Sequence, residues 1–573
     1  MQGARALVRV LKESGVEHIF GLPGDTGMAF YEALGEETGS ITHVMTRDER
    51  SASFMADVYA RVSGRLGVCE GPSGGGATYI LPGVAEAQGS AIPLLCLTSD
   101  TPVSQQGRGV LTELDQEGLF RPVTKWNTRV NSATRMAEMA RRAIRMATSG
   151  RPGATHLSLP TDALEGETPD EGVYGVPAFG RAPALRTRPD VADVERAIVA
   201  LLAAERPVIV AGGGVLTSGA AEALTAFAEA LGVPVGTSIN GKGSVAETSE
   251  VAIGVVGGNG GRPYANACLA EADLVFFVGT RTDSTTTCHW TLPPPEGGQR
   301  VMHLDVEPWE IGNNYRLVAG LAGDARLGLL DLLAAVDKPM ATRRRHASRI
   351  AALVAERDRY WAEVERQAAI RAQPIKPAQV VRALRGLLDD EALIVADPGT
   401  PTPFLAAQYE VRRSGRTTII PRAHGGLGYA IPGVVGAAFA APGRRVVGMT
   451  GDGSFGMSVG ELETISRHGL PIVIIQCSNG SFGWIKELQH LYHGDRYFGV
   501  DFDPVDYSAI ARGFGFRARQ VIDPDDVESA VAGALSDGGP YFLDIVTESP
   551  MTETPPVAAW QQAEANLRIA RGS

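Results

Sequence analysis

The sequence predicts an α/β protein built from three doubly wound parallel-sheet domains. Short apolar runs that end in glycine or proline turns alternate with segments of helical periodicity over most of the 573 residues. This is the pattern of repeated strand–helix–strand units, and the length suits several ordinary domains. Two aperiodic stretches, 164–189 and 373–377, divide the chain. We therefore expect domains at 1–165, 190–338 and 375–550.

Composition excludes several classes of protein. The hydrophobic content of 44% and charged content of 21% are those of a globular protein. A net charge of −12 argues against nucleic acid as a partner, and the Arg343–Arg345 run is interpreted as a solvated helix face. No signal-peptide pattern and no apolar run of membrane-spanning length occur, so we expect no membrane association. Five cysteines without a C-x-x-C pair indicate reduced thiols and a cytoplasmic protein.

The glycine-rich turns of the first domain follow strand ends. Gly21–Asp25 follows the first strand, and Pro72–Thr78 follows the third; glycines before a helix let the backbone approach a ligand closely. Glu49 lies at a helix N-terminus, where the helix dipole alone would favour it, and a functional role stays open. The expected strands are 17–20, 41–45, 67–70, 92–98 and 156–160, and the expected helices are 4–15, 28–34 and 51–63.

The second domain repeats the same alternation. Strands are expected at 206–211, 233–235, 274–278 and 301–305. Gly212–Gly214 follows the first of them but lacks the spacing of a dinucleotide fingerprint, so nucleotide binding and a structural turn are both open. A charged helix, 341–369, leads to the third domain.

In the third domain, two buried strands are joined by a crossover. The first, 446–449, ends in Gly451–Ser454, and the second, 471–477, opens into Ser478–Ser481. Ser458 and Glu461 have the spacing of a capping box and predict where the intervening helix starts. Other elements are a helix at 378–388, a strand at 392–396 that ends in Asp397–Thr400, and a closing strand at 541–546; the tail after Glu548 is expected to lie over a neighbouring surface.

Two polar side chains should meet at one edge of this sheet. Parallel strands joined by a crossover helix have both carboxyl ends at the same edge, so Asp452 and Asn479 can point at one spot. A carboxylate and an amide oxygen, beside glycines that expose backbone N–H groups, suit a hard cation that carries a diphosphate.

These motifs resemble the thiamine-diphosphate-dependent enzymes, and most closely the acetolactate synthase-like branch. The most specific part is Gly451-Asp452-Gly453-Ser454 with Asn479 at the right distance. The resemblance extends from about Ala4 to Glu548. Supporting matches are FGLPGD at 20–25, RDERSASFMADVYARVSG at 47–64, RPVTK at 121–125, RPVIVAGGG at 206–214, LDVEPWEIG at 304–312 and GGLGYAIP at 425–432.

The resemblance implies a site for thiamine diphosphate (ThDP) and Mg²⁺. Asp452, the Asn479 side chain and the Ser481 carbonyl would bind the metal, and backbone N–H groups in the third domain would hold the diphosphate. Leu427 would wedge between the two cofactor rings. The implied cofactor-binding set is Pro23, Gly399, Thr400, Gly425, Leu427, Gly451, Asp452, Gly453, Ser454, Asn479 and Ser481.

The resemblance also implies the reaction. Glu49 would lie against N1′ of the aminopyrimidine and favour loss of the C2 proton and formation of an ylid. The Gly425 carbonyl would accept a hydrogen bond from the aminopyrimidine. Gln116 is the other catalytic candidate. The expected enzyme is a transferase or lyase. It decarboxylates a 2-keto acid, pyruvate by default, and ligates the carbanion to a second carbonyl compound. A simple 2-keto acid decarboxylase or C–C lyase is the alternative. Family members join these domains across subunits, which implies a homodimer or homotetramer.

At the substrate end the sequence departs from the family. Leu488 replaces a tryptophan, and Asp115 replaces an aromatic residue before Gln116, which favours another 2-keto acid or an aldehyde. Lys125 could meet a substrate carboxylate or be a surface lysine. Whether the middle domain binds FAD, ADP or nothing stays open. The substrate-pocket candidates are Gly24, Gly75, His424, Trp484, Ile485 and Leu488; for His424 and Trp484, ordinary structural roles are the alternatives.

Overall fold

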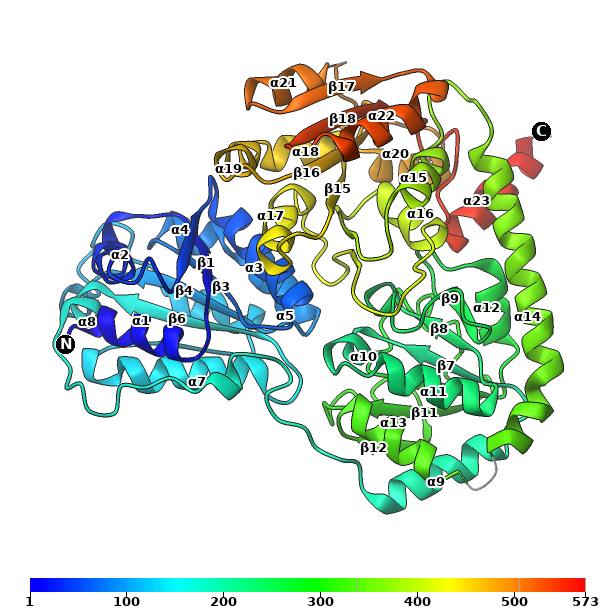
Figure 1. The fold of residues 1–573 in the computed structure, drawn as a ribbon, viewed down its shortest axis with the longest axis horizontal. Helices are drawn as coiled ribbons and strands as arrows, with labels where there is room; N and C mark the ends of the chain where they lie inside the picture. Colours follow the sequence, from blue (N-terminus) through cyan, green and yellow to red (C-terminus); the bar gives the residue numbers. More distant parts are fainter. Residues whose placement is uncertain (337–338, 504, 572–573) are drawn as a thin grey trace. The chain divides into compact units, whose positions relative to one another are not determined.

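The computed structural model describes residues 1–336, 339–503 and 505–571. The chain forms two compact units. The first comprises residues 1–185, 421–448 and 456–472, and the second comprises residues 186–420, 449–455 and 473–573. Figure 1 colours the elements along the chain. Three six-stranded sheets, in which every described pairing is parallel, confirm the predicted fold class.

The first sheet has the strand order β2-β1-β3-β4-β6-β5 (Figure 1). All residues of β4 and β6 are buried, because a parallel sheet covered on both faces needs apolar runs. The strand β5 was not expected, since its sequence WNTR is polar and half-exposed. The bounds are β1 His18–Gly21, β2 Thr42–Met45, β3 Gly67–Gly71, β4 Leu94–Asp100, β5 Trp126–Arg129 and β6 Ala154–Pro160, with helices α1 Gly3–Glu13, α2 Met28–Gly35, α5 Leu81–Gly89, α6 Gln116–Phe120 and α7 Met136–Thr148.

The helix α3 (Glu49–Ser63) is the most enclosed helix of the first unit. The Asp48 side chain caps its start by accepting the Arg50 N–H at 2.8 Å, and Gly64, at φ 67°, ends it. Neighbouring elements approach its backbone through glycine. A Cβ on Gly436 of α17 (Ala430–Ala440) would lie 2.1 Å from the Met55 carbonyl oxygen. The tight packing therefore fixes the N-terminus of α3, where Glu49 lies.

The second sheet has the order β12-β11-β10-β7-β8-β9. Strands β9 and β12 were not expected, because each is short and contains glycine and alanine. Arg343 and Arg345 are exposed, as predicted, whereas the Arg344 side chain and residues 337–338 lie outside the described residues. The bounds are β7 Pro207–Ala211, β8 Val235–Thr237, β9 Ala252–Val255, β10 Leu274–Val278, β11 Arg300–Asp305 and β12 Leu317–Ala322, with helices α9 Val191–Leu202, α10 Gly213–Thr217, α11 Ala221–Leu231, α12 Pro263–Ala270, α13 Ala325–Ala334 and the long α14 Pro339–Ala368.

The third sheet has the order β14-β13-β15-β16-β18-β17. Its central strands β15 and β16 are neighbours, as predicted from the crossover. Of its two outer strands, β14 lies where further strands were expected without bounds, and β17 was not expected. The bounds are β13 Leu393–Ala396, β14 Thr418–Ile419, β15 Val446–Gly451, β16 Ile472–Ser478, β17 Arg517–Val521 and β18 Tyr541–Val546, with helices α15 Pro377–Leu387, α16 Pro401–Gln408, α21 Tyr507–Gly513 and α22 Val527–Ser536.

The crossover between β15 and β16 corrects one prediction. Two helices, α18 (Asp452–Ser458) and α19 (Glu461–Arg467), replace the single capped helix. Ser458 is the last residue of α18, its Oγ is buried without a partner, and α19 has no side-chain cap. The Glu461 carboxylate instead accepts the Arg47 N–H at 2.9 Å and the Thr464 hydroxyl at 2.7 Å. The capping-box prediction was wrong because a tertiary hydrogen bond occupies the glutamate.

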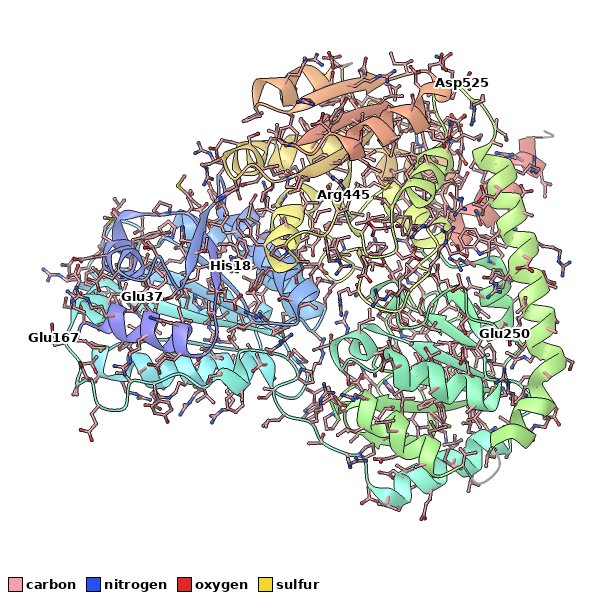
Figure 2. All side chains as sticks on the ribbon, viewed as in Figure 1. His18, Glu37, Glu167, Glu250, Arg445 and Asp525 are labelled. Carbon is pink, nitrogen blue, oxygen red and sulfur yellow. The ribbon has the colours of Figure 1, made fainter. Side chains whose placement is uncertain are left out.

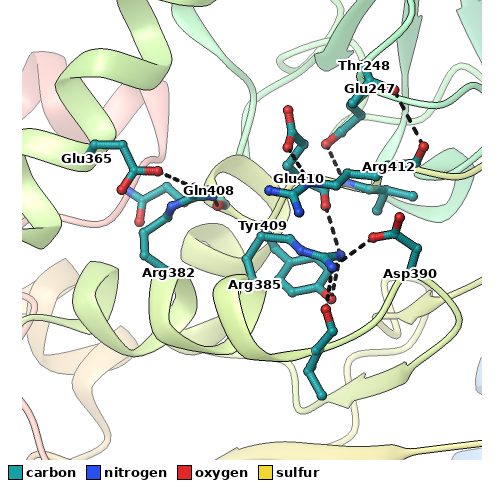
Figure 3. Close-up of polar contacts among 12 residues, drawn as sticks. Glu247, Thr248, Glu365, Arg382, Arg385, Asp390, Gln408, Tyr409, Glu410 and Arg412 are labelled. Carbon is teal, nitrogen blue, oxygen red and sulfur yellow. Dashed lines mark hydrogen bonds and ion pairs between the residues drawn. The ribbon is translucent and has the colours of Figure 1, made fainter. Parts of the chain in front are cut away.

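Buried charges join the chain after α16 to the second sheet. The Glu247 carboxylate accepts Lys242 Nζ at 2.7 Å, Arg262 Nη2 at 2.9 Å and the Val411 N–H at 2.9 Å. Arg385 donates to the Tyr409 hydroxyl at 3.1 Å (Figure 3). Each charge has an oppositely charged or hydrogen-bonding partner, as burial requires. These bonds tie the segment around Tyr409 and Val411 to the second sheet and to α15.

Surface and thiol chemistry agree with the sequence. Acidic side chains such as Glu167, Glu250 and Asp525 are exposed (Figure 2). All five cysteines are free and four are buried. Within the described residues, no helix is long and apolar enough to span a membrane.

The helix α20 (Gly483–His493) packs against the C-terminal helix α23 (Ala558–Arg571). The rings of Trp484 and Trp560 lie 4.2 Å apart between their centroids. Glu487 is fully buried beside them, and neither carboxylate oxygen has a hydrogen-bond partner. Burial raises the pKa of Glu487 to about 7. A carboxylate in this place therefore destabilises the packing of α20 once it ionises.

The Gly436 position should tolerate no side chain. We expect Gly436→Ala to destabilise the protein by about 1–3 kcal/mol, because the new methyl group would overlap the Met55 carbonyl and force α17 away from α3. Gly533→Ala on α22, where the added Cβ meets no atom within 4 Å, is the matched control and should be neutral or stabilising by up to about 1 kcal/mol. Urea unfolding measures both. Equal effects of the two changes would contradict this packing.

Glu487 predicts a pH-dependent stability. Since its pKa is raised on folding to about 7, the folded protein binds more protons than the unfolded chain between the unfolded pKa and pH 7, and stability falls as pH rises through this window. Glu487→Gln should therefore raise the melting temperature by about 2–4 °C at pH 8 and much less at pH 5. Glu528→Gln, on the exposed side of α22, controls for the lost charge. A shift that is the same at both pH values would refute the assignment.

Candidate active site

Asp452 and Asn479 meet at the carboxyl edge of the third sheet. Asp452 begins α18 directly after β15, and Asn479 follows β16. The Asp452 Oδ2 atom accepts the N–H groups of Asn479 at 3.0 Å and Gly480 at 2.7 Å, and Oδ1 accepts the Gly453 N–H at 3.0 Å. The predicted meeting of the two segments is confirmed, because two backbone donors that follow β16 bind the Asp452 carboxylate.

The donor set at this edge fits a hard divalent cation. Asn479 Oδ1 accepts the Ser481 hydroxyl at 3.0 Å, so an amide oxygen and Ser481 lie beside Asp452. Burial raises the pKa of Asp452, while the N–H groups of Gly480, Asn479 and Gly453 oppose the shift. In the described part of the chain, no cluster of three His, Cys, Asp or Glu side chains is arranged to bind a metal. A cation here would therefore depend on amide and carbonyl oxygens beside one carboxylate, which is chemistry that Mg²⁺ accepts.

Glycines keep this edge open. A Cβ on Gly399, at φ 122°, would meet no atom within 4 Å, and one on Gly451 would meet only the Cys477 carbonyl oxygen, at 3.8 Å. Gly453 is different, because a Cβ there would lie 2.7 Å from the Phe482 ring. Thr400 precedes α16 and is half-buried, and Ser454 is buried in α18. The space beside Gly399 and Gly451 leaves room for a ligand that approaches the backbone closely.

Glu49 lies in a glycine-lined recess of the first unit. Its side chain is 7% exposed. A Cβ on Gly71 would lie 3.3 Å from Glu49 Cγ, and one on Gly76 would lie 3.1 Å from Glu49 Oε1. Burial raises the pKa of Glu49, and the carboxylates of Asp48 and Glu70 add to the shift. The carboxyl is therefore suited to hold a proton nearer neutral pH than an exposed glutamate.

The Pro23–Gly24 turn lies against the Pro72–Thr78 loop, which follows β3. A Cβ on Gly24 would lie 2.4 Å from the Pro72 side chain, whereas one on Gly75 would meet nothing within 4 Å. Pro23 is exposed. The structure therefore brings the two predicted turns of this unit together at the end of β1 and β3.

The segment 421–428 carries Gly425 and Leu427. Gly425 has φ 75° and its added Cβ would meet no atom, while Gly428 has φ 79° and packs on Met457. Leu427 is half-buried and the His424 residue is exposed. The His424 N–H donates to Glu86 at 2.7 Å. Backbone geometry, rather than side-chain packing, dominates this segment.

Two candidates are occupied by structural hydrogen bonds. Gln116 is 2% exposed; its Oε1 accepts the Thr98 hydroxyl, and its Nε2 donates to the Ser99 carbonyl at 3.0 Å. Lys125 Nζ donates to the carbonyls of Met146, Ser149 and Arg151 at 2.6–2.9 Å. Lys125 thus caps the end of α7, which differs from the predicted alternative of an ordinary surface lysine.

The residues of α20 divide between two environments. Trp484 and Leu488 pack on the cluster around Trp560, which supports the structural alternative for Trp484. Ile485 is 47% exposed. In the second sheet, a Cβ on Gly212 would lie 2.2 Å from the Gly279 carbonyl oxygen, so close packing of two turns accounts for this glycine without a nucleotide.

Sequence reasoning did not single out three buried groups near these residues. Glu70 accepts the Tyr31 hydroxyl and lies 3.0 Å from His43 Nε2. Glu86 and Glu487 are fully buried. The only sequence signal for Glu86 was a lone carboxylate within the apolar segment LPGVAEAQG.

Models of one family match most of the chain. The models are described as thiamine pyrophosphate enzyme, N-terminal TPP binding domain, at residues 1–119; thiamine pyrophosphate enzyme, central domain, at 194–333; and thiamine pyrophosphate enzyme, C-terminal TPP binding domain, at 397–545. Thiamine pyrophosphate is another name for ThDP. Glu49 lies within the first matched range, and Asp452 and Asn479 lie within the last.

Relatives named acetolactate synthase or probable acetolactate synthase are similar over almost the full chain. A probable acetolactate synthase large subunit of Methanocaldococcus jannaschii is 33% identical, with 96% of this chain and 92% of the relative covered. That of Methanococcus aeolicus is 32% identical, with 97% and 94% covered. The acetolactate synthase isozyme 3 large subunit of Escherichia coli is 31% identical, with 93% and 92% covered. The chain belongs to the thiamine pyrophosphate enzyme family.

Proposed function

We propose that this protein is a ThDP- and Mg²⁺-dependent carboligase. It decarboxylates a 2-keto acid, pyruvate by default, and transfers the resulting carbanion unit to a second carbonyl compound. The observation that carries the proposal is the orientation of Asp452 by the N–H groups of Asn479 and Gly480. The relatives named acetolactate synthase support the reaction type.

In this proposal Asp452, Asn479 and Ser481 hold Mg²⁺. Asp452 and Asn479 oxygens accept hydrogen bonds within the loop, and the Ser481 carbonyl accepts the Gly483 N–H, so little ordering would be required when the cation binds. The metal and nearby backbone N–H groups hold the diphosphate. The backbone donors belong to Gly399, Thr400, Gly451, Gly453 and Ser454.

Glu49 acts on the other end of the cofactor. Its buried carboxyl, with a raised pKa, would hold a proton at N1′ of the aminopyrimidine. The Gly425 carbonyl would accept a hydrogen bond from the cofactor, and Leu427 and Pro23 would hold its rings. Bound ThDP supplies the electron sink for decarboxylation.

The substrate end is assigned to residues of different chemistry. Ile485 offers an exposed apolar side chain, and His424 offers an exposed polar one. Trp484 and Leu488 shape the wall through their packing on α23, and Gly24 and Gly75 leave space. Gln116 acts by fixing Thr98 and Ser99. The replacement of an expected tryptophan by Leu488 supports a donor or acceptor other than that of acetolactate synthesis.

Assembly and location belong to the same proposal. A homodimer or homotetramer would join a Glu49 segment to a metal loop of another copy, as the family resemblance implies. The five free thiols support a reducing cytoplasm. Size-exclusion chromatography coupled to light scattering tests the assembly.

Product analysis tests the reaction. Purified protein is incubated with ThDP, Mg²⁺ and a panel of 2-keto acids and aldehydes, and the products are identified by mass spectrometry. We expect release of CO₂ and formation of a ligated hydroxyketone. Chelation of the metal should abolish both signals, because the diphosphate loses its bridging cation. Release of CO₂ with free aldehyde as the sole organic product would assign a simple decarboxylase and overturn the carboligase proposal.

Glu49→Gln tests the proton at N1′. We expect CO₂ release to fall about 10²–10⁴-fold, because an amide cannot exchange the proton, while ThDP affinity measured by calorimetry changes only a few-fold. Glu195→Gln, an exposed change on α9, should leave both values unaltered. Undiminished turnover of Glu49→Gln would remove Glu49 from the reaction.

A further inference from the structure

One buried carboxylate binds four consecutive backbone N–H groups. Glu86 lies on α5 and is fully buried. Its two oxygens accept the N–H groups of Arg422 at 3.2 Å, Ala423 at 3.1 Å, His424 at 2.7 Å and Gly425 at 3.3 Å. All five residues belong to the first unit. The backbone of 422–425 is thus wrapped around a single anion, in the manner of an anion-binding nest.

Surrounding groups keep this anion charged. Arg61 Nη2 donates to Glu86 at 3.1 Å, and the Ser90 hydroxyl donates at 2.7 Å. Burial would raise the pKa of Glu86, but Arg61 and the N–H of His424 outweigh it and hold the pKa below its usual range. Arg61 also bonds Asp57 at 2.8 Å. Glu86 is therefore an ionised acceptor at neutral pH, and its hydrogen bonds are charge-assisted.

The segment that Glu86 binds has no regular secondary structure. Residues 423–425 are exposed and lie outside any helix or strand. Gly425 has φ 75° with open space where a side chain would be. Glycine loses much conformational freedom on folding, so this backbone needs an external acceptor to keep one conformation. The Gly425 carbonyl belongs to the same residue as the bound Gly425 N–H, so fixing that N–H also restricts the direction of the carbonyl. Leu427 is two residues further along the chain.

We propose that Glu86 is a positioning residue for the active site: its carboxylate fixes the backbone of 422–425 and thereby aims the Gly425 carbonyl and sets the place of Leu427. Glu86 does not touch the cofactor. The roles of the Gly425 carbonyl and Leu427 in this inference rest on the proposed function. The ordering of residues 422–425 by Glu86 is independent of it.

Two neighbouring carboxylates provide a matched comparison. Both Glu86 and Asp57 are buried and bonded to Arg61, yet only Glu86 accepts the N–H groups of 422–425. Glu86→Gln keeps the size of the side chain but replaces one of its two acceptor oxygens with an NH₂ group. That NH₂ group would face the backbone N–H groups, which are also donors. Asp57→Asn removes the same charge from Arg61 and changes the acceptor of the Tyr429 hydroxyl, but it leaves the acceptor of 422–425 in place. A merely structural role predicts similar consequences for both variants.

Amide hydrogen exchange without cofactor measures the ordering itself. We expect Glu86→Gln to accelerate exchange of the 422–425 amides at least about tenfold, and Asp57→Asn to leave them within about twofold at matched stability. If Glu86→Gln does not fold, Ser90→Ala takes its place as the test. This change removes one donor to Glu86 and should accelerate exchange of the 422–425 amides by a smaller factor. Unchanged exchange of these amides in the folded Glu86 variant, or in Ser90→Ala if that variant replaces it, would overturn the inference.

A second readout links the ordering to the site. With saturating ThDP and Mg²⁺, Glu86→Gln should slow C2–hydrogen exchange of the bound cofactor about tenfold and lower kcat in parallel, with KM for the keto acid changed less than about threefold. Glu86→Asp should recover part of the rate. Equal loss in Asp57→Asn would show that Glu86 acts through stability alone. If the wild-type protein itself failed to bind ThDP, the proposed function would fail, and amide exchange would still decide the role of Glu86 in ordering the segment.

Discussion

Glycine-rich loops that expose backbone N–H groups to a ligand have few side chains with which to pack. In this protein, hydrogen bonds to buried carboxylates fix the conformation of such loops. Asp452 accepts two N–H groups just after β16 and one from Gly453 in α18, and Glu86 accepts four from one segment. In both places glycine leaves room beside the backbone, which costs conformational entropy. The hydrogen bonds to an ionised acceptor offset that cost, so the open edges of the two units depend on them.

The central parts of the fold were predictable because apolar runs report burial. Strands β4, β6, β10 and β16 are fully buried, and each was expected from its sequence. The outer strands β5 and β17 were not, since an edge strand is short or half-exposed and lacks a clear hydrophobic period. The capping-box prediction failed for another reason. Local spacing cannot reveal that the Arg47 N–H, far away in the chain, binds Glu461.

The candidate site shows the same division. The meeting of Asp452 with the segment after β16 followed from the topology of a parallel crossover, which is a local rule. Gln116 and Lys125 carried the right chemistry in sequence, but their polar atoms bind Thr98 and the end of α7. The part played by Glu86 was not predictable, because its partners lie in a segment that only the folded chain brings to α5.

The Glu86 hydrogen bonds also constrain the order in which the chain can be completed during synthesis. Arg422 follows Glu86 by 336 residues. At a translation rate of about 5–20 residues per second, roughly 20–70 s separate the two on the ribosome. During that interval the first sheet can form, but the Arg61–Glu86 pair has to rely on water for the acceptor bonds that 422–425 later satisfies. The final geometry of this unit is therefore a late event in the life of each new molecule.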